Sequence, residues 1–132
     1  MAWTVNPTAD ELQLLAECGV VLREAGRYGE AREVFQGLCE LRGQSATPYV
    51  ELAKTYMQEG DLAGAEKQFR RALTVEPQNA HAWASLMELA FFKKDSTGVR
   101  TNAQKAMELD PAGPSGEFAR TFVAEAERLS LL

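Results

Sequence analysis

A period of 34 residues is the feature that most constrains this chain. Blocks 12–45, 46–79 and 80–113 align with one another in a single register and without gaps. A repeat of this length is one supersecondary unit that cannot bury its apolar face alone, so neighbouring units must stack. We therefore expect residues 1–132 to form one domain, in which residues 114–132 cover the end of a stack of three units.

The middle block shows the pattern most clearly, with apolar or small residues at block positions 4, 7, 8, 11, 20, 24 and 27 and a proline at position 32. These residues are Tyr49, Leu52, Ala53, Tyr56, Ala65, Phe69, Ala72 and Pro77. The first four are spaced as one face of a helix, and the next three form a facing stripe on a second helix. Small residues at positions 8 and 20 let the two helices approach closely.

This pattern resembles the tetratricopeptide signature at all eight places, with Tyr49 in place of tryptophan and Ala53 in place of glycine. The other two blocks keep part of it: Gly19, Ala31 and Phe35 in the first, and Trp83, Leu86, Ala106 and Pro111 in the third. The resemblance implies an all-α solenoid of three antiparallel helical hairpins plus a C-terminal capping helix, about seven helices in all.

Helix ends can be placed in the same register. Thr8 and Glu11 are spaced as a capping box, and Asp61 and Asp95 are suited to cap second helices. The turns inside the hairpins are predicted at Gly26, at Gly60 and at Asp95-Ser96, and Pro77 and Pro111 follow the ends of second helices. A last helix is expected from Glu117 to about Leu129, with Phe118, Phe122, Ala126 and Leu129 on its buried stripe.

Composition excludes several classes of function. The net charge is −5 and basic residues are interleaved with acidic ones, so we predict no nucleic-acid partner. No apolar run is long enough to cross a membrane and no signal peptide is visible, which favours a cytoplasmic protein. Cys18 and Cys39 lack metal-ligand spacing and occupy apolar stripes, so we expect both cysteines to be small core residues.

We predict no cofactor, no metal and no enzymatic activity.

In the tetratricopeptide fold the first helix of each hairpin lines a concave groove, and block positions 2, 5, 9, 12 and 13 tend to point into it. The resemblance therefore implies a partner-binding groove formed by Gln13, Val20, Arg23, Val50, Lys54, Met57, His81, Glu88 and Phe91. The apolar members suit an extended peptide with apolar anchors. Alternatively, Met57 and Phe91 pack against the next hairpin or the last helix, one of Phe91 and Phe92 belongs to the core, and His81 is a surface residue.

Residues 26–41 also resemble the first repeat of type III secretion chaperones for translocator proteins, through a Gly-Arg-Tyr turn, Ala31, Phe35 and the pair Leu38-Cys39. That resemblance implies a chaperone whose concave face holds an extended segment of a secreted protein. Chaperones of needle subunits or export components are a neighbouring possibility. The alternative is a scaffold or assembly adaptor, as in pilus or envelope-complex biogenesis, that binds folded partners.

The N-terminal segment carries Trp3 and Val5 ahead of the first helix cap. Large apolar side chains favour burial. They either pack against the first hairpin or contact a second copy of the chain, and the second option gives a homodimer.

Overall fold

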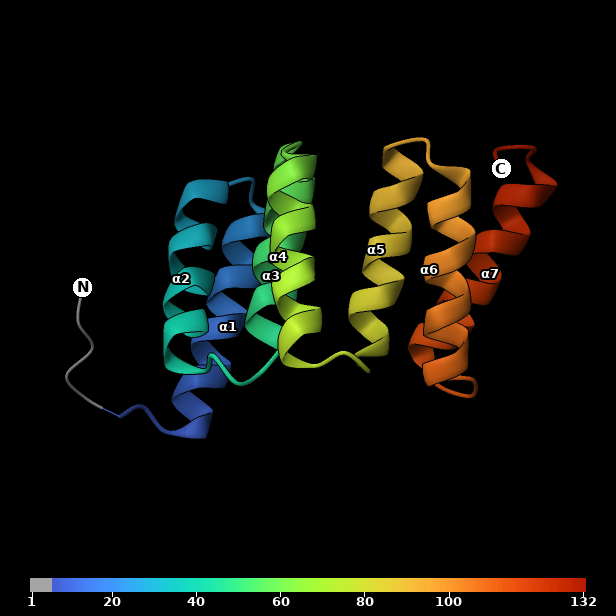
Figure 1. The fold of residues 1–132 in the computed structure, drawn as a ribbon. Helices are drawn as coiled ribbons and strands as arrows, with labels where there is room; N and C mark the ends of the chain where they lie inside the picture. Colours follow the sequence, from blue (N-terminus) through green and yellow to red (C-terminus); the bar gives the residue numbers. More distant parts are fainter. Residues whose placement is uncertain (1–5) are drawn as a thin grey trace.

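The structure, a computed structural model, describes residues 6–132, and all regular elements in this range are helices (Figure 1). They are α1 (Ala9–Glu24), α2 (Tyr28–Leu41), α3 (Thr47–Glu59), α4 (Leu62–Val75), α5 (Ala80–Phe92), α6 (Ser96–Leu109) and α7 (Pro114–Arg128). The predicted all-α solenoid of three hairpins and a C-terminal helix is confirmed. The expectations for Trp3 and Val5 lie outside the described residues.

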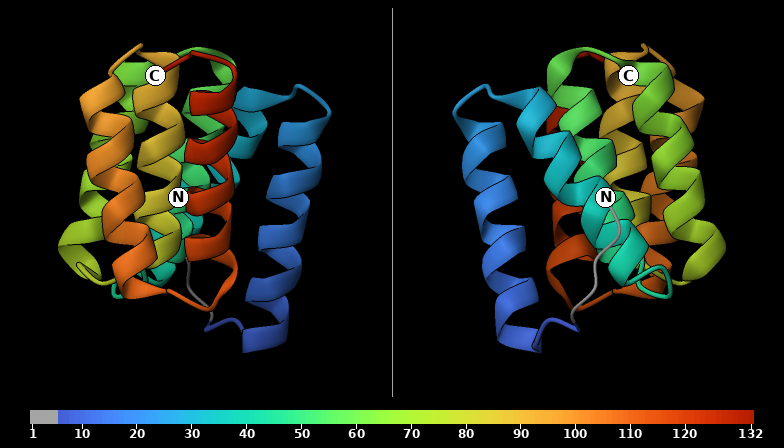
Figure 2. Two further views of the ribbon diagram at one scale, coloured as in Figure 1. Left: turned by 90° about the vertical axis from the view of Figure 1, so that its right-hand side faces the viewer. Right: turned by 90° about the vertical axis from the view of Figure 1, so that its left-hand side faces the viewer.

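The helices stack in chain order along one axis (Figure 1). Each helix packs mainly against its neighbours in the sequence, and α7 packs against both α6 and α5. Figure 2, viewed from the two ends of the array, shows α1 and α7 standing out on one side, while α4 and α6 lie on the other. No helix among residues 6–132 combines the length and the apolar character that a membrane span requires.

The core consists of three apolar clusters distributed along the array. Phe69 is fully buried in the middle cluster, and Phe35 is fully buried in the first. The predicted close approach of the two helices in a hairpin is visible at Gly19, where an added Cβ would lie 2.6 Å from the Phe35 ring. A larger residue at this position would force α1 and α2 apart.

Side-chain caps start most of the helices. The Thr8 hydroxyl accepts a hydrogen bond from the Glu11 amide (3.2 Å), and the carboxylates of Asp61 and Asp95 accept from the amides at the third helical position (2.9 and 3.0 Å). The caps predicted at these residues are therefore confirmed. Asn79 caps α5 in the same way (2.9 Å), which the sequence pattern did not single out.

The turn inside each hairpin contains a residue with a left-handed backbone. These residues are Gly26 (φ 79°), Gly60 (φ 96°) and Lys94 (φ 59°), and they are equivalent positions of the 34-residue repeat. The third turn was expected at Asp95-Ser96 because it lacks glycine. The structure instead keeps the register and puts a lysine where the other two turns have glycine.

The last helix departs from its predicted form. It begins at Pro114 rather than Glu117, and its buried face consists of Gly116, Ala119 and Ala126. Phe118 and Leu129 were expected on that face but are exposed. The other two members of the predicted stripe are on the packed side: Ala126 is buried, and the half-buried Phe122 packs against Phe91 of α5.

Cys18 is exposed, which corrects its expected place in the core. Leu14 and Val21, on the same side of α1, are 62% and 67% exposed. The equivalent positions of α3, which are Pro48, Leu52 and Thr55, are buried where the first hairpin packs against α3. On α1 the stripe of Leu14, Cys18 and Val21 is exposed.

Candidate functional site

The face formed by α1, α3, α5 and α7 carries most of the residues that the sequence assigned to a groove, and we call it the inner face. Three hollows mark it or its edge. The α1–α3 hollow has a volume of about 230 Å³, the α5–α7 hollow about 220 Å³, and the Phe91 hollow, at the turn between α5 and α6, about 430 Å³.

The α1–α3 hollow has an apolar floor and a polar rim. Phe35 and Leu38 of α2 lie at its base, and Gln13, Thr47 and Glu51 are among the side chains around its opening. Such a combination suits a side chain with an apolar body, while the polar rim can bind the backbone of a bound segment.

A buried ion pair joins α1 to α3 beside this hollow. Arg23 is almost fully buried, and its Nη1 lies 2.7 Å from a carboxylate oxygen of Glu51 and 3.2 Å from the Glu51 carbonyl oxygen. The guanidinium also lies over the Phe35 ring, 5.7 Å from its centroid. Arg23 was predicted to contact a partner, but the structure corrects this: its side chain is used inside the molecule.

The α5–α7 hollow combines titratable and aromatic side chains. His81, Ser85 and Glu88 of α5 line one side, and Phe118 of α7 lines the other. Burial raises the pKa of the Glu88 carboxyl, and the nearby Lys54 ammonium offsets part of this rise. His81 is exposed as a whole residue, yet burial around its ring lowers the pKa, and Lys54 lowers it further while Glu51 opposes. At neutral pH the lining histidine is therefore uncharged.

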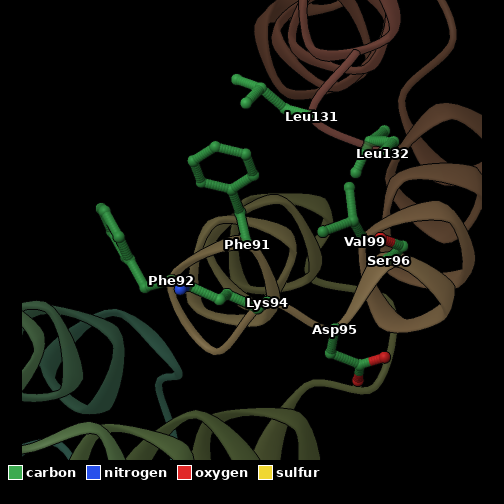
Figure 3. A pocket seen from close by; sticks show the side chains of 8 residues that line it. All are labelled: Phe91, Phe92, Lys94, Asp95, Ser96, Val99, Leu131 and Leu132. Atoms are coloured by element: carbon green, nitrogen blue, oxygen red, sulfur yellow. The ribbon is translucent and has the colours of Figure 1, made fainter.

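The Phe91 hollow is mainly apolar (Figure 3). Figure 3 shows Phe91 and Phe92 leaving α5 in different directions, with Leu131 and Leu132 across the hollow from Phe91. Phe91 stacks edge-on against Phe122 of α7, with ring centroids 5.2 Å apart, and belongs to the third core cluster. Phe92 is 56% exposed. Of the two phenylalanines, Phe91 therefore packs against the last helix and Phe92 is the accessible one.

The predicted groove residues are thus divided among different environments. Gln13 lines the α1–α3 hollow, His81 and Glu88 line the α5–α7 hollow, and Phe91 lines its own. The side chains that are half-buried on the inner face are those of Val20, Lys54 and Met57.

Val50 does not fit the prediction. It is 1% exposed and belongs to the middle core cluster. The corresponding positions of α1 and α5 hold alanine, so the larger side chain at this place fills the space between hairpins instead of facing solvent.

Several side chains that line these hollows were not predicted from the sequence, among them Glu51, Ser85 and Phe118. Glu51 and Ser85 both occupy block position 6, one residue after a position assigned to the groove, and Phe118 was assigned to the buried stripe of the last helix. A helical wheel that places positions 2, 6, 9 and 13 on one stripe would have found Glu51 and Ser85.

These features define a helical-repeat protein with a hollowed inner face and no strands among residues 6–132. The family model described as tetratricopeptide repeat matches residues 22–91, more than half of the chain. The chain belongs to the tetratricopeptide repeat family.

Among curated proteins, the chain is 36% identical over 89 residues to the probable biofilm formation methyltransferase WspC of Pseudomonas aeruginosa, covering 64% of this chain and 20% of WspC. It is 25% identical over 91 residues to cellulose synthase operon protein C of Komagataeibacter sucrofermentans, covering 69% of this chain and 7% of that protein. The chain thus matches only a fifth or less of the length of these two relatives.

Solved structures match nearly the whole fold. PcrH from Pseudomonas aeruginosa superposes with a TM-score of 0.80 at 21% identity, covering 98% of this chain and 99% of PcrH. The Yersinia enterocolitica type III secretion translocator chaperone SycD has a TM-score of 0.80 at 19% identity, covering 92% and 91%. SycD in complex with a peptide of the translocator YopD has a TM-score of 0.76 at 21% identity, covering 93% and 96%. At these identities the likeness establishes the fold alone.

Proposed function

We propose that the inner face binds an extended segment of a partner protein, and that the chain acts as a cytoplasmic chaperone of the type III secretion kind, without catalytic activity. The observation that carries this proposal is the set of three hollows, two on the inner face and one at its edge by the α5–α6 turn, each lined by apolar or aromatic side chains beside polar ones. Such a series suits side chains that project at intervals from an extended peptide.

The structural neighbours support the same role. SycD has been solved with a peptide of the translocator YopD, and its fold matches this chain over nearly its full length. The fold is therefore compatible with holding an extended peptide.

A single substitution at the edge of the inner face tests the binding site. Phe92→Asp introduces a charge at an exposed aromatic side chain beside the Phe91 hollow, and we expect at least tenfold weaker binding of the partner segment with unchanged helical circular dichroism. Leu129→Asp is the matched control, because Leu129 is similarly exposed but lines none of the three hollows. Equal binding by the two variants and the unmodified chain would exclude this edge of the face from the binding site.

The chaperone role itself needs a second experiment. We expect an export substrate encoded near this chain to be insoluble alone and soluble when the two are co-expressed, and a peptide from that substrate to bind in isolation. A substrate that stays insoluble on co-expression would argue against the chaperone.

The alternative, an interaction module for assembly, is favoured by the curated relatives. WspC and cellulose synthase operon protein C are much longer proteins, and the match covers 20% and 7% of their lengths. An adaptor would bind its partner only in the folded state. Binding that is lost when the partner is reduced to short peptides would support this alternative.

We further propose that the stripe of Leu14, Cys18 and Val21 on α1 is a contact with a second copy of the chain. Its support is the repeat itself, because the same side of α3 is buried against the preceding hairpin. Leu14 and Val21 are exposed, and exposed apolar side chains on one side of a helix mark a candidate contact surface.

A further inference from the structure

The chain holds two of its own arginines in the same way, by a glutamate together with an aromatic ring. Arg23 pairs with Glu51 at 2.7 Å and lies over the Phe35 ring. Arg32 pairs with Glu59 and lies over the Tyr56 ring, 5.6 Å from its centroid. A planar guanidinium suits both contacts at once, since its edge donates to a carboxylate and its face stacks on a ring.

The α5–α7 hollow presents the same two groups with no arginine in its lining. Glu88 supplies a carboxylate and Phe118 an exposed ring. Glu88 forms no salt bridge within residues 6–132. A half-buried carboxylate without a close counter-ion destabilises the free chain, and a cation placed beside it would offset that cost.

Ser85 adds an unsatisfied hydrogen-bonding group to the lining. It is 1% exposed, and its hydroxyl has no hydrogen-bond partner. The repeat explains this: Ser85 is equivalent to Glu51, and the position that holds Arg23 in the first hairpin holds Met57 in the second. A methionine thioether cannot replace the donors of a guanidinium. Buried hydroxyls without partners are uncommon, and a donor on a bound ligand would satisfy this one.

We propose that the α5–α7 hollow binds an arginine side chain of the partner segment. This inference rests on the proposed function, and it specifies the side chain by which the partner segment is held at one of the hollows. The guanidinium pairs with Glu88, stacks on Phe118 and donates to the Ser85 hydroxyl, a combination of carboxylate and aromatic ring like the one that holds Arg23.

The other charged groups near the hollow do not favour an anion in its place. Lys54 on α3 is the nearby cation, but it does not line the hollow, and Glu51 lies on the same helix. The start of α7 is already occupied by the Asp110 carboxylate, which accepts a hydrogen bond from the Ser115 amide at 3.0 Å. At neutral pH the lining therefore has one ionisable carboxyl group, Glu88, beside an uncharged His81.

The test uses the whole chain and small probes. N-acetyl-arginine N-methylamide is titrated into ¹⁵N-labelled protein, with the citrulline and norleucine analogues as a neutral isostere and an apolar comparison. We expect saturable shifts of the Ser85, Glu88 and Phe118 amides, with at least tenfold weaker binding of citrulline and norleucine. Glu88→Gln should weaken arginine binding at least tenfold, and Lys54→Met should strengthen it by removing a competing cation.

The control variant is Glu117→Gln, which removes the same charge from an exposed neighbour of Phe118 outside the lining. Equal losses in Glu88→Gln and Glu117→Gln, equal binding of arginine and citrulline, or shifts confined to other surfaces would each overturn the proposal. The titration needs no partner protein, so a negative result would refute the arginine site without refuting the proposed peptide binding, which the Phe92→Asp experiment tests separately. Conversely, binding of the arginine probe would be observed even if the chain had no peptide partner.

Discussion

At the scale of single residues, burial depends on what the neighbouring hairpin leaves open. Block position 5 holds Ala16, Val50 and Ala84, and the sequence pattern treats the three alike. In the structure Val50 is a core residue, whereas Ala16 lines the α1–α3 hollow. Core residues such as Phe69 could be predicted, because their burial depends only on the facing sides of the two helices in one hairpin. Groove residues were harder to predict, because the next hairpin determines whether a side chain at the same block position is buried or exposed.

Truncating the central core aromatic is expected to be costly. Phe69→Ala should reduce the free energy of unfolding by about 3–5 kcal/mol, because the ring is fully buried and the space cannot close completely. Phe92→Ala is the matched control and should cost less than about 1 kcal/mol, since that ring is largely exposed. Chemical denaturation followed by circular dichroism measures both, and similar losses in the two variants would contradict the assigned repeat register.

Glu88 should make stability depend on pH. Its pKa is raised in the folded chain, so the folded state binds the proton more tightly than the unfolded state, and stability decreases as pH rises above about 4.5 through the raised pKa. Glu88→Gln is therefore expected to be more stable than the unmodified chain at pH 7, with the difference disappearing near pH 4. Thermal unfolding at the two pH values checks the sign, and a less stable variant at pH 7 would mean that the carboxylate has a favourable partner.

At the scale of elements, the repeat register extends beyond the three blocks. Salt bridges between Arg32 and Glu59, Glu66 and Lys93, and Arg100 and Glu127 each join residues 27 positions apart. Glu127 of α7 thus occupies the place that Glu59 and Lys93 occupy on α3 and α5, although α7 keeps little of the repeat signature. From the sequence alone α7 was expected to be a cap with its own stripe, so its start was placed at Glu117, and Phe118 and Leu129 were wrongly added to Phe122 and Ala126 on the packed face.

The third hairpin turn is a site of backbone strain. Lys94 adopts the left-handed conformation that glycine adopts in the other two turns, at a cost of roughly 1–2 kcal/mol for a residue with a Cβ. Lys94→Gly should relieve this strain and stabilise the chain by up to about 1 kcal/mol. The gain is smaller than the strain because glycine has more conformational freedom to lose on folding. Gly60→Ala, the reverse change in the second turn, should destabilise it. The midpoints of urea unfolding measure both changes in stability. If Lys94→Gly lowers the midpoint, the lysine side chain stabilises the folded chain by more than its backbone strain costs.

At the scale of the whole molecule, the class of fold followed from the period of 34 residues, and hairpin order and helix number needed no further information. The two ends of the array were harder to predict. A repeat pattern describes contacts between units, and an end lacks one neighbour, so the same pattern of apolar residues that is buried in α3 is exposed in α1.

The α1 stripe makes a prediction about association. Leu14→Glu combined with Val21→Glu should leave helicity and unfolding free energy nearly unchanged, because both side chains are largely exposed. The same double change should abolish self-association, measured as the dependence of sedimentation on protein concentration. A chain that is monomeric before substitution would refute the proposed contact with a second copy, and a double variant that unfolds would place these residues in the core.

The proposed contact between two α1 stripes would set the symmetry of the assembly. Both chains would present the same surface, which makes the contact isologous. Such a contact would join two copies about a two-fold axis, and an assembly of this kind would close at two chains.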